Sequence, residues 1–149
     1  MENHKKLADE LHIYAVPQTV YKLHPLFDQV LLRVLQRDTS ALILLLHSDR
    51  GARSRSKGND KHERGGWFQK FESRIRAVAD TLSSGQNTSS NSLLERLLLL
   101  PRLSSLQFST VCALADVVID PFPVGGGRST LEIFATGVFV CPHKHLYLF

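Results

Sequence analysis

Short apolar runs alternate with amphipathic segments along most of this 149-residue chain. The continuous run Ala41–Leu46 (ALILLL) is typical of a strand that is covered on both faces. The segment Pro25–Arg37 instead spaces its apolar residues three and four positions apart, which is the spacing of one helix face, and a proline suits the first helical turn. The two patterns follow one another in turn, and this predicts strands separated by helices.

The same patterns predict five strands and four helices in all. The predicted strands are Leu11–Val16, which Pro17 ends, Ala41–Leu46, a buried Arg96–Leu100 ended by Pro101, Val117–Ile119 and Val138–Val140. The predicted helices are Pro25–Arg37, Trp67–Leu82, one that Ser104 caps and that carries Leu106, Val111 and Leu114, and Ser129–Thr136, which Gly137 ends. This alternation implies an α/β fold, a Rossmann-like parallel sheet with flanking helices in a single domain over residues 1–149.

Three polar or divergent segments interrupt the alternation. We expect flexible surface loops at residues 48–66, which are basic, and 83–92, which are polar, and a divergent tail at 142–149. The net charge of +4 is concentrated in the first of these and the segment after it, because Arg50–Arg76 holds nine Lys or Arg residues against three acids. The basic loop leaves open an alternative function in binding RNA or an acidic partner. Aromatic residues beside it are limited to Trp67 and Phe68, so nucleic acid is the weaker expectation.

Cysteine usage and hydropathy exclude several classes of protein. Cys112 and Cys141 lie in apolar contexts without metal-ligand spacing, so we expect two buried thiols, no disulfide framework and no metal site. No apolar run reaches the roughly 18–20 residues that a membrane span needs, and the first six residues lack the apolar core of a secretion signal. We therefore expect a soluble protein of the cytoplasm or nucleus with no membrane partner.

The candidate chemistry lies where the strand Val117–Ile119 meets the last helix. Gly125, Gly126 and Gly127 stand at this junction and are followed by Arg128, Ser129 and Thr130. Glycines let a backbone approach a ligand closely, and the amides at a helix start suit an anion, so this junction is a candidate phosphate site. It carries neither G-x-G-x-x-G nor a Walker sequence, and a purely structural turn is the alternative.

Glu132 lies one turn into the same helix. An acid at this position has two possible roles. It complements the helix dipole, or it accepts hydrogen bonds from the vicinal hydroxyls of a sugar, as acids do in dinucleotide sites. In the second case the phosphate and the sugar beside it indicate a nucleotide.

Two motifs together resemble a known family. The segment PQTVYKLHP (residues 17–25) and, about a hundred residues later, LADVVIDPFPVGGGRSTLEIFATGV (114–138) are similar to the donor-binding, C-terminal half of GT-B glycosyltransferases of the O-linked N-acetylglucosamine transferase type. The resemblance covers roughly residues 11–141 apart from the basic loop. It implies a GT-B half that is incomplete here, because the N-terminal lobe, which carries much of the acceptor site, is not encoded.

The resemblance also implies roles for particular residues. Lys22 would be the catalytic cation that neutralises the departing diphosphate, and Gln18 would contact the donor, although a solvated lysine and a turn glutamine are the alternatives. The diphosphate would lie against Gly126, Gly127, Ser129 and Thr130. Glu132 would hold the ribose hydroxyls, and the loop containing Arg102 would pack on uracil. Gly127 stands where animal members have histidine, and Arg128 would replace that charge.

The implied reaction transfers a sugar from a UDP-sugar, UDP-N-acetylglucosamine in the family, to a Ser or Thr hydroxyl of a protein acceptor with no obligatory cofactor or metal. A non-catalytic truncated remnant and a nucleotide-binding module remain alternatives. His24 is expected to cap the helix start rather than to act as a base.

Overall fold

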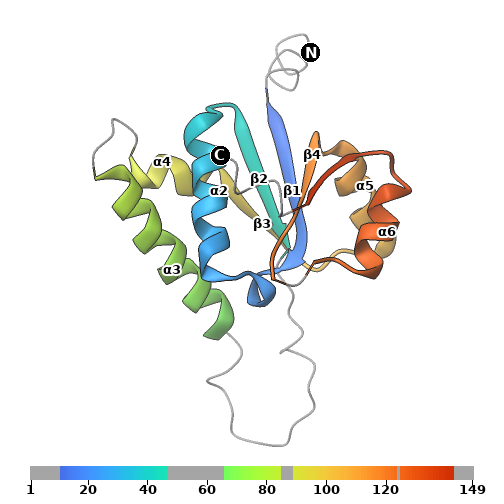
Figure 1. Cartoon of the computed structure of the whole chain (residues 1–149), viewed down its shortest axis with the longest axis horizontal. Coiled ribbons are helices and arrows are strands. Elements are labelled where there is room, and N and C mark those ends of the chain that lie inside the picture. The colour runs from blue at the N-terminus through green and yellow to red at the C-terminus, as the bar shows by residue number, and fades with distance from the viewer. Residues whose placement is uncertain (1–10, 47–65, 85–88, 124, 143–149) are drawn as a thin grey trace, which may run out of the picture.

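A computed structural model describes residues 11–46, 66–84, 89–123 and 125–142 of the chain (Figure 1). Within these ranges five strands form one sheet in the order β3-β2-β1-β4-β5, and every neighbouring pair is parallel. The strands are β1 (His12–Thr19), β2 (Ala41–Leu46), β3 (Leu97–Leu100), β4 (Val117–Asp120) and β5 (Phe139–Pro142). The predicted parallel, Rossmann-like α/β fold is therefore confirmed.

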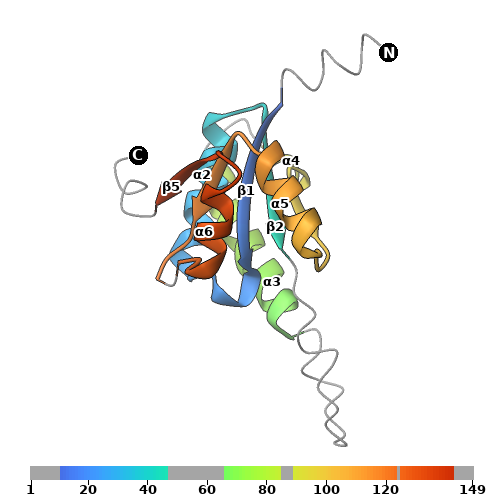
Figure 2. The same ribbon diagram turned by 90° about the vertical axis from the view of Figure 1, so that its right-hand side faces the viewer.

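Helices cover both faces of this sheet. The 3-10 helix η1 (Val20–Lys22) follows β1, and the α-helices are α2 (Pro25–Arg37), α3 (Gly66–Ser83), α4 (Ser90–Glu95), α5 (Ser105–Leu114) and α6 (Arg128–Phe134). In Figure 1, α2, α3 and α4 lie on one side of the sheet and α5 and α6 on the other. Figure 2, viewed from the side of α5 and α6, shows these two helices in front of the sheet. No helix within the described ranges is long and apolar enough to cross a membrane.

The core has two parts of unequal size, one on each face. Under α2 and α3 it holds large side chains that are at most 3% exposed, among them Phe27, Leu31, Ile43, Phe71 and Ile75. Under α5 and α6 the buried residues are mostly small: Ala15, Cys112, Ala115, Val118 and Ile133. The first face therefore supplies most of the apolar burial that stabilises the domain.

Two helix starts agree with the sequence signals, whereas the end of α6 does not. His24 is the N-cap of α2, where its Nδ1 accepts a hydrogen bond from Leu26 N at 3.2 Å. Ser104 and Gln107 form a capping box at the start of α5. α6 ends at Phe134 rather than at the predicted Thr136, and Gly137, three residues beyond it, has φ +77°, a conformation that side-chain-bearing residues rarely adopt.

The first strand is longer than predicted, because Pro17 does not end it. β1 pairs with β2 from His12 to Val16, slips at Pro17 and Gln18, and resumes at Thr19. A proline has no N–H to donate, so a bulge is a place where a central strand tolerates it. The bulge has a functional consequence, because it displaces Gln18 from the regular ladder.

Three other boundaries differ from the prediction. β3 is not a buried central strand, because it lies at the sheet edge and Leu98 is 42% exposed. Part of the polar segment 83–92 is helical: α3 extends to Ser83, and α4 begins at Ser90 because Leu93 packs into the core. Pro142 belongs to β5 rather than to the tail. Gly66 opens α3. The rest of the basic loop and the tail beyond Pro142 lie outside the described residues.

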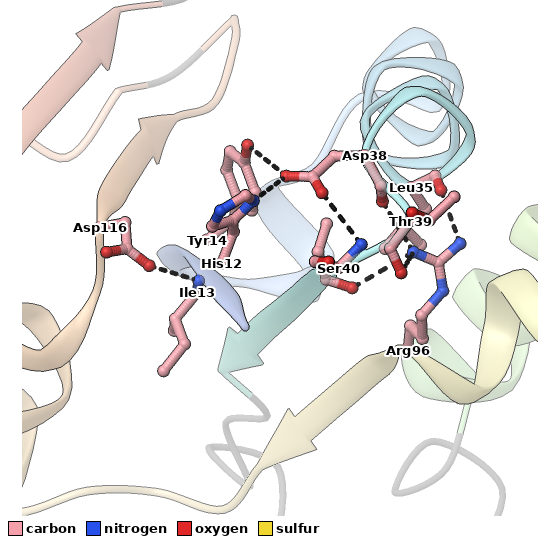
Figure 3. Close-up of polar contacts among 10 residues, drawn as sticks. His12, Ile13, Tyr14, Leu35, Asp38, Thr39, Ser40, Arg96 and Asp116 are labelled. Atoms are coloured by element: carbon pink, nitrogen blue, oxygen red, sulfur yellow. Dashed lines mark hydrogen bonds and ion pairs between the residues drawn. The ribbon is translucent and has the colours of Figure 1, made fainter. Parts of the chain in front are cut away.

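A polar network lies at the amino ends of the strands (Figure 3). Asp38, at the end of α2, accepts hydrogen bonds from His12 Nδ1 (2.7 Å), Tyr14 Oη (3.0 Å) and Ser40 N (3.0 Å). Burial acts to raise the pKa of Asp38, but these hydrogen bonds outweigh it and lower the pKa. Arg96 donates to carbonyls at the C-terminal end of α2 and in the turn after it. These contacts tie the amino ends of the strands to α2, whereas ligands of parallel sheets bind at the opposite, carboxyl ends.

Candidate functional site

The strand order places the topological switch point of the sheet between β1 and β4, and we call the region outside the carboxyl ends of these two strands the crevice. The two strands are neighbours, but they pair only at Tyr14 with Val117 and at Ala15 with Val118. Beyond these pairs the chain leaves β1 toward the face of α2 and leaves β4 toward the face of α6 (Figure 1). In open parallel sheets, ligands bind at such a point, outside the carboxyl ends of the two strands.

Gln18 occupies this crevice with one polar atom unsatisfied. The side chain is only 4% exposed, and its Oε1 accepts a hydrogen bond from Lys22 Nζ at 3.1 Å. Its Nε2 is buried and has no hydrogen-bond partner among the described residues. Leaving a buried donor unpaired costs about 1–3 kcal/mol, so the position calls for a further acceptor.

The loop after β4 lies against Gln18 because Gly126 has no side chain. A Cβ built on Gly126 would overlap Thr130 Oγ1 and stand 3.1 Å from Gln18 Nε2. The same construction on Gly125 would place its Cβ 2.7 Å from Asp120 Oδ2. Asp120 also accepts a hydrogen bond from Gly126 N at 2.8 Å. Close packing therefore explains the first two glycines of the run.

Gly127 needs glycine for a different reason. Its φ is +52°, and a Cβ there would meet nothing within 4 Å. Backbone conformation thus explains this position, and the junction is at once a structural turn and a close approach to Gln18. The run of three glycines does not by itself require a ligand.

The start of α6 contributes less than the sequence suggested. The helix has seven residues, and the amides of Ser129 and Thr130 already donate to Gly126 O and Gly127 O, each at 3.1 Å. Amides that already donate hydrogen bonds, at the start of a helix of only two turns, are expected to bind an anion weakly. The strongest donors at the crevice are therefore the side chains of Gln18, Lys22 and Thr130.

Two predicted site residues, Arg128 and Glu132, form an exposed pair on α6. Arg128 Nε lies 2.9 Å from Glu132 Oε1, and the two side chains are 91% and 45% exposed. An exposed ion pair of this spacing is worth only about 0.3–0.5 kcal/mol, so either partner can exchange it for another contact. Their predicted roles toward a donor stay predictions.

Arg102 is further away in the sheet. It follows β3, and β2 lies between that strand and β1. Arg102 is exposed and makes no hydrogen bond or ion pair with the described residues. The structure therefore brings Gln18, Lys22, Gly126 and Thr130 together. Arg102 also follows the carboxyl end of a strand, but that strand is separated from β1 by β2.

Sequence reasoning missed two acids, one at the carboxyl end of β4 and one in the first turn of α2. Asp120, which shapes the glycine loop, was detectable as the acid that ends β4 after its apolar residues. Asp28 was not: it is fully buried on α2 and pairs with Arg74 Nε and Nη2 on α3. Burial raises the pKa of Asp28, and the hydrogen bonds from Arg74 offset part of this shift. Nothing in the local sequence links two residues that are 46 positions apart.

The cysteines differ in burial. Cys112 is buried, as predicted, and burial raises its pKa to about 11, whereas Cys141 is only half-buried. Both are free thiols. The described part of the chain contains no group of three or more His, Cys, Asp or Glu residues placed to hold a metal ion.

Comparison with known proteins extends the fold assignment. No family model matches the sequence, and no curated protein matches it. Among solved structures, the chain is similar to a UDP-forming α,α-trehalose-phosphate synthase from Burkholderia xenovorans, with a TM-score of 0.55 and 9% sequence identity. The match covers 91% of this chain but only 29% of the synthase chain, and at this identity the likeness concerns the fold.

Proposed function

We propose that this domain binds a nucleotide-sugar and corresponds to the donor-binding half of a GT-B glycosyltransferase. The observation that carries the proposal is the Gln18 side chain. It is only 4% exposed, and its Nε2 lacks a hydrogen-bond partner among the described residues. It lies at the carboxyl end of β1, in the crevice between β1 and β4, beside a lysine. A phosphate or sugar oxygen in the crevice would satisfy this donor.

The side chains around Gln18 suit a diphosphate. Lys22 Nζ carries a positive charge and three donors, of which one goes to Gln18 Oε1. Thr130 Oγ1 adjoins Gly126 and offers a hydroxyl on the other wall. Gly126, Gly127 and Ser129 would let the phosphates approach the backbone, and Arg128 would add charge once it leaves Glu132.

Lys22 would be the catalytic residue of this half. In the proposed transfer, an acceptor oxygen attacks the anomeric carbon, the bond from that carbon to the diphosphate breaks, and the electron pair leaves with UDP. The acceptor proton goes to a base outside the residues assigned here. A cation held at the leaving group stabilises charge that develops in the transition state, which is where electrostatic catalysis acts most strongly.

The finer assignments rest on the sequence resemblance. UDP-N-acetylglucosamine as donor, a Ser or Thr hydroxyl of a protein as acceptor, Glu132 at the ribose and Arg102 near uracil all come from the two motifs. The structural neighbour is a UDP-forming enzyme, which supports a uridine nucleotide in the site. An acceptor site would come from a second lobe, since the chain spans only 29% of the neighbour.

Isothermal calorimetry tests the proposal. The folded chain is titrated with UDP, UDP-N-acetylglucosamine and UDP-glucose, and with ADP to measure base selectivity. We expect the Lys22→Ala and Gln18→Met variants to bind about tenfold more weakly, because each removes a contact to an anion worth roughly 1.5–3 kcal/mol.

The matched control is Arg33→Ala, which removes an exposed cation of α2 outside the crevice. An affinity equal to that of the unmodified chain is expected for it. If circular dichroism shows a folded protein and no uridine nucleotide gives heat, the proposal fails and the non-catalytic remnant becomes the better reading.

A further inference from the structure

Asp120 is the last residue of β4 and lies at the crevice. Its Oδ1 accepts a hydrogen bond from Gly126 N at 2.8 Å, so the chain that leaves the strand at Asp120 is brought back to it at Gly126. Between these two residues, Phe122 is only 7% exposed, and its ring centre lies 5.7 Å from that of Phe27 in the core. The connection after β4 is therefore held by one apolar contact and one polar contact.

The polar contact fixes the glycine loop, residues 125–127, to the sheet. Among the described residues, no other hydrogen bond joins these three glycines to a strand, because the carbonyls of Gly126 and Gly127 accept from the first turn of α6. The Asp120 carboxylate also packs directly on Gly125, where a Cβ would stand 2.7 Å from Oδ2. Both carboxylate oxygens therefore lie against the loop.

The glycine loop in turn determines the surroundings of Gln18. Gly126 lies so close that a Cβ on it would stand 3.1 Å from Gln18 Nε2. Within the described ranges, the ladder between β1 and β4 ends at Ala15 and Val118, before it reaches either residue. Strand pairing thus does not set the distance between Gly126 and Gln18, and the side chain of Asp120 does.

We propose that Asp120 is a positioning residue of the nucleotide-sugar site, which acts through its hydrogen bond to Gly126 and not through its charge. It holds the glycine loop against Gln18, so that this amide and the Thr130 hydroxyl face one crevice at a fixed separation. A carboxylate aimed at a diphosphate would repel it, and here both oxygens are turned to the loop instead. The inference rests on the proposed function, because the role concerns binding at that site.

Asp116 offers a matched control at the other end of the same strand. It directly precedes β4, and its Oδ2 accepts a hydrogen bond from Ile13 N at 2.7 Å. Each of the two acids thus joins one carboxylate to one backbone amide. Removing either should lower the stability of the domain, but only the loss of Asp120 should change the crevice.

Calorimetry with UDP on three variants tests the role. We expect Asp120→Ala to bind UDP about tenfold more weakly, because the loop loses a hydrogen bond to a charged group. Asp120→Asn keeps an oxygen that accepts from Gly126 N and loses the negative charge, so it should bind UDP at least as tightly as the unmodified chain. Asp116→Ala should leave the affinity unchanged.

NMR of the ¹⁵N-labelled proteins without ligand follows the loop itself. The backbone amide of Gly126 and the side-chain amide of Gln18 should both shift in Asp120→Ala. Neither should shift in Asp116→Ala, although urea denaturation should show a loss of stability in both alanine variants. A role in stability alone would not produce this difference between the two acids.

Several results would overturn the inference. One is an Asp120→Ala chain that binds UDP as tightly as the unmodified chain, and another is equal weakening in Asp116→Ala, which would indicate a general loss of stability. Weaker binding by Asp120→Asn would show that the charge itself is required, and this variant decides the question if Asp120→Ala does not fold. If the folded, unmodified chain binds no uridine nucleotide, the proposed function fails and this role falls with it, whatever the variants do.

Discussion

Replacing Gly126 by alanine should destabilise the domain by about 1–2 kcal/mol. The added Cβ would overlap Thr130 Oγ1, and it would lie 3.1 Å from Gln18 Nε2 and 3.2 Å from Thr130 N. Overpacking of this kind costs roughly 1–3 kcal/mol, and the smaller entropy of the unfolded alanine chain returns roughly 0.4–1 kcal/mol. The difference between the midpoints of these ranges, about 1.3 kcal/mol, gives the expected loss. Urea denaturation followed by circular dichroism measures it.

A double-mutant cycle makes the reasoning specific. Thr130→Ala removes the hydroxyl that the new Cβ would strike, so it should recover part of the stability lost in Gly126→Ala, with a coupling of at least about 0.5 kcal/mol. Gly127→Ala serves as the comparison. It should also lose roughly 1–2 kcal/mol, but through its positive φ rather than through contact, because nothing lies within 4 Å of its Cβ.

Thr130→Ala should therefore not rescue Gly127→Ala. Equal rescue of both variants, or no coupling between positions 126 and 130, would refute the account of why the run contains three glycines. Calorimetry with UDP adds a functional measurement. Gly126→Ala should also weaken binding, since its Cβ presses on the Gln18 amide.

Three further predictions concern stability. Arg96→Ala should lower the free energy of unfolding by about 2 kcal/mol in urea titrations, because its guanidinium satisfies carbonyls at the end of α2, the closest at 2.6 Å; an unchanged midpoint would contradict this role. Asp28→Asn should cost about 3 kcal/mol or more by the same measurement, since it leaves Arg74 beside a buried neutral group; a loss under about 1 kcal/mol would show that the pair is not needed. Tyr14 has its pKa raised to about 12 by burial and by its hydrogen bond to Asp38, so its stabilising contribution is complete below about pH 10 and is lost as pH rises toward 12. Tyr14→Phe should flatten this decline in the free energy of unfolding at alkaline pH. Identical stability–pH profiles for the two proteins would exclude a contribution from Tyr14.

Much of the local structure could be predicted from the sequence. The alternation of apolar runs and helical spacing indicated the parallel α/β fold, because strand and helix periods are properties of neighbouring residues. The N-caps at His24 and Ser104 and the turn at Gly137 were predictable for the same reason: each depends on contacts within a few positions or on one φ angle. The glycine junction was singled out because three glycines precede a helix start, and Lys22 because the segment 17–25 resembles a known family.

Strand order and side-chain partners were decided only by tertiary structure. No local pattern says that β1 lies between β2 and β4, yet that order creates the crevice and makes β3 an edge strand. The bulge at Pro17 depends on pairing with β2, and the orphan amide of Gln18 depends on the bulge and on the approach of Gly126. Asp28 and Arg74 meet across 46 residues because α2 and α3 pack on the same face. Such contacts depend on how the connections between the strands pack back onto the sheet. The spacing of apolar residues along the chain does not contain that information.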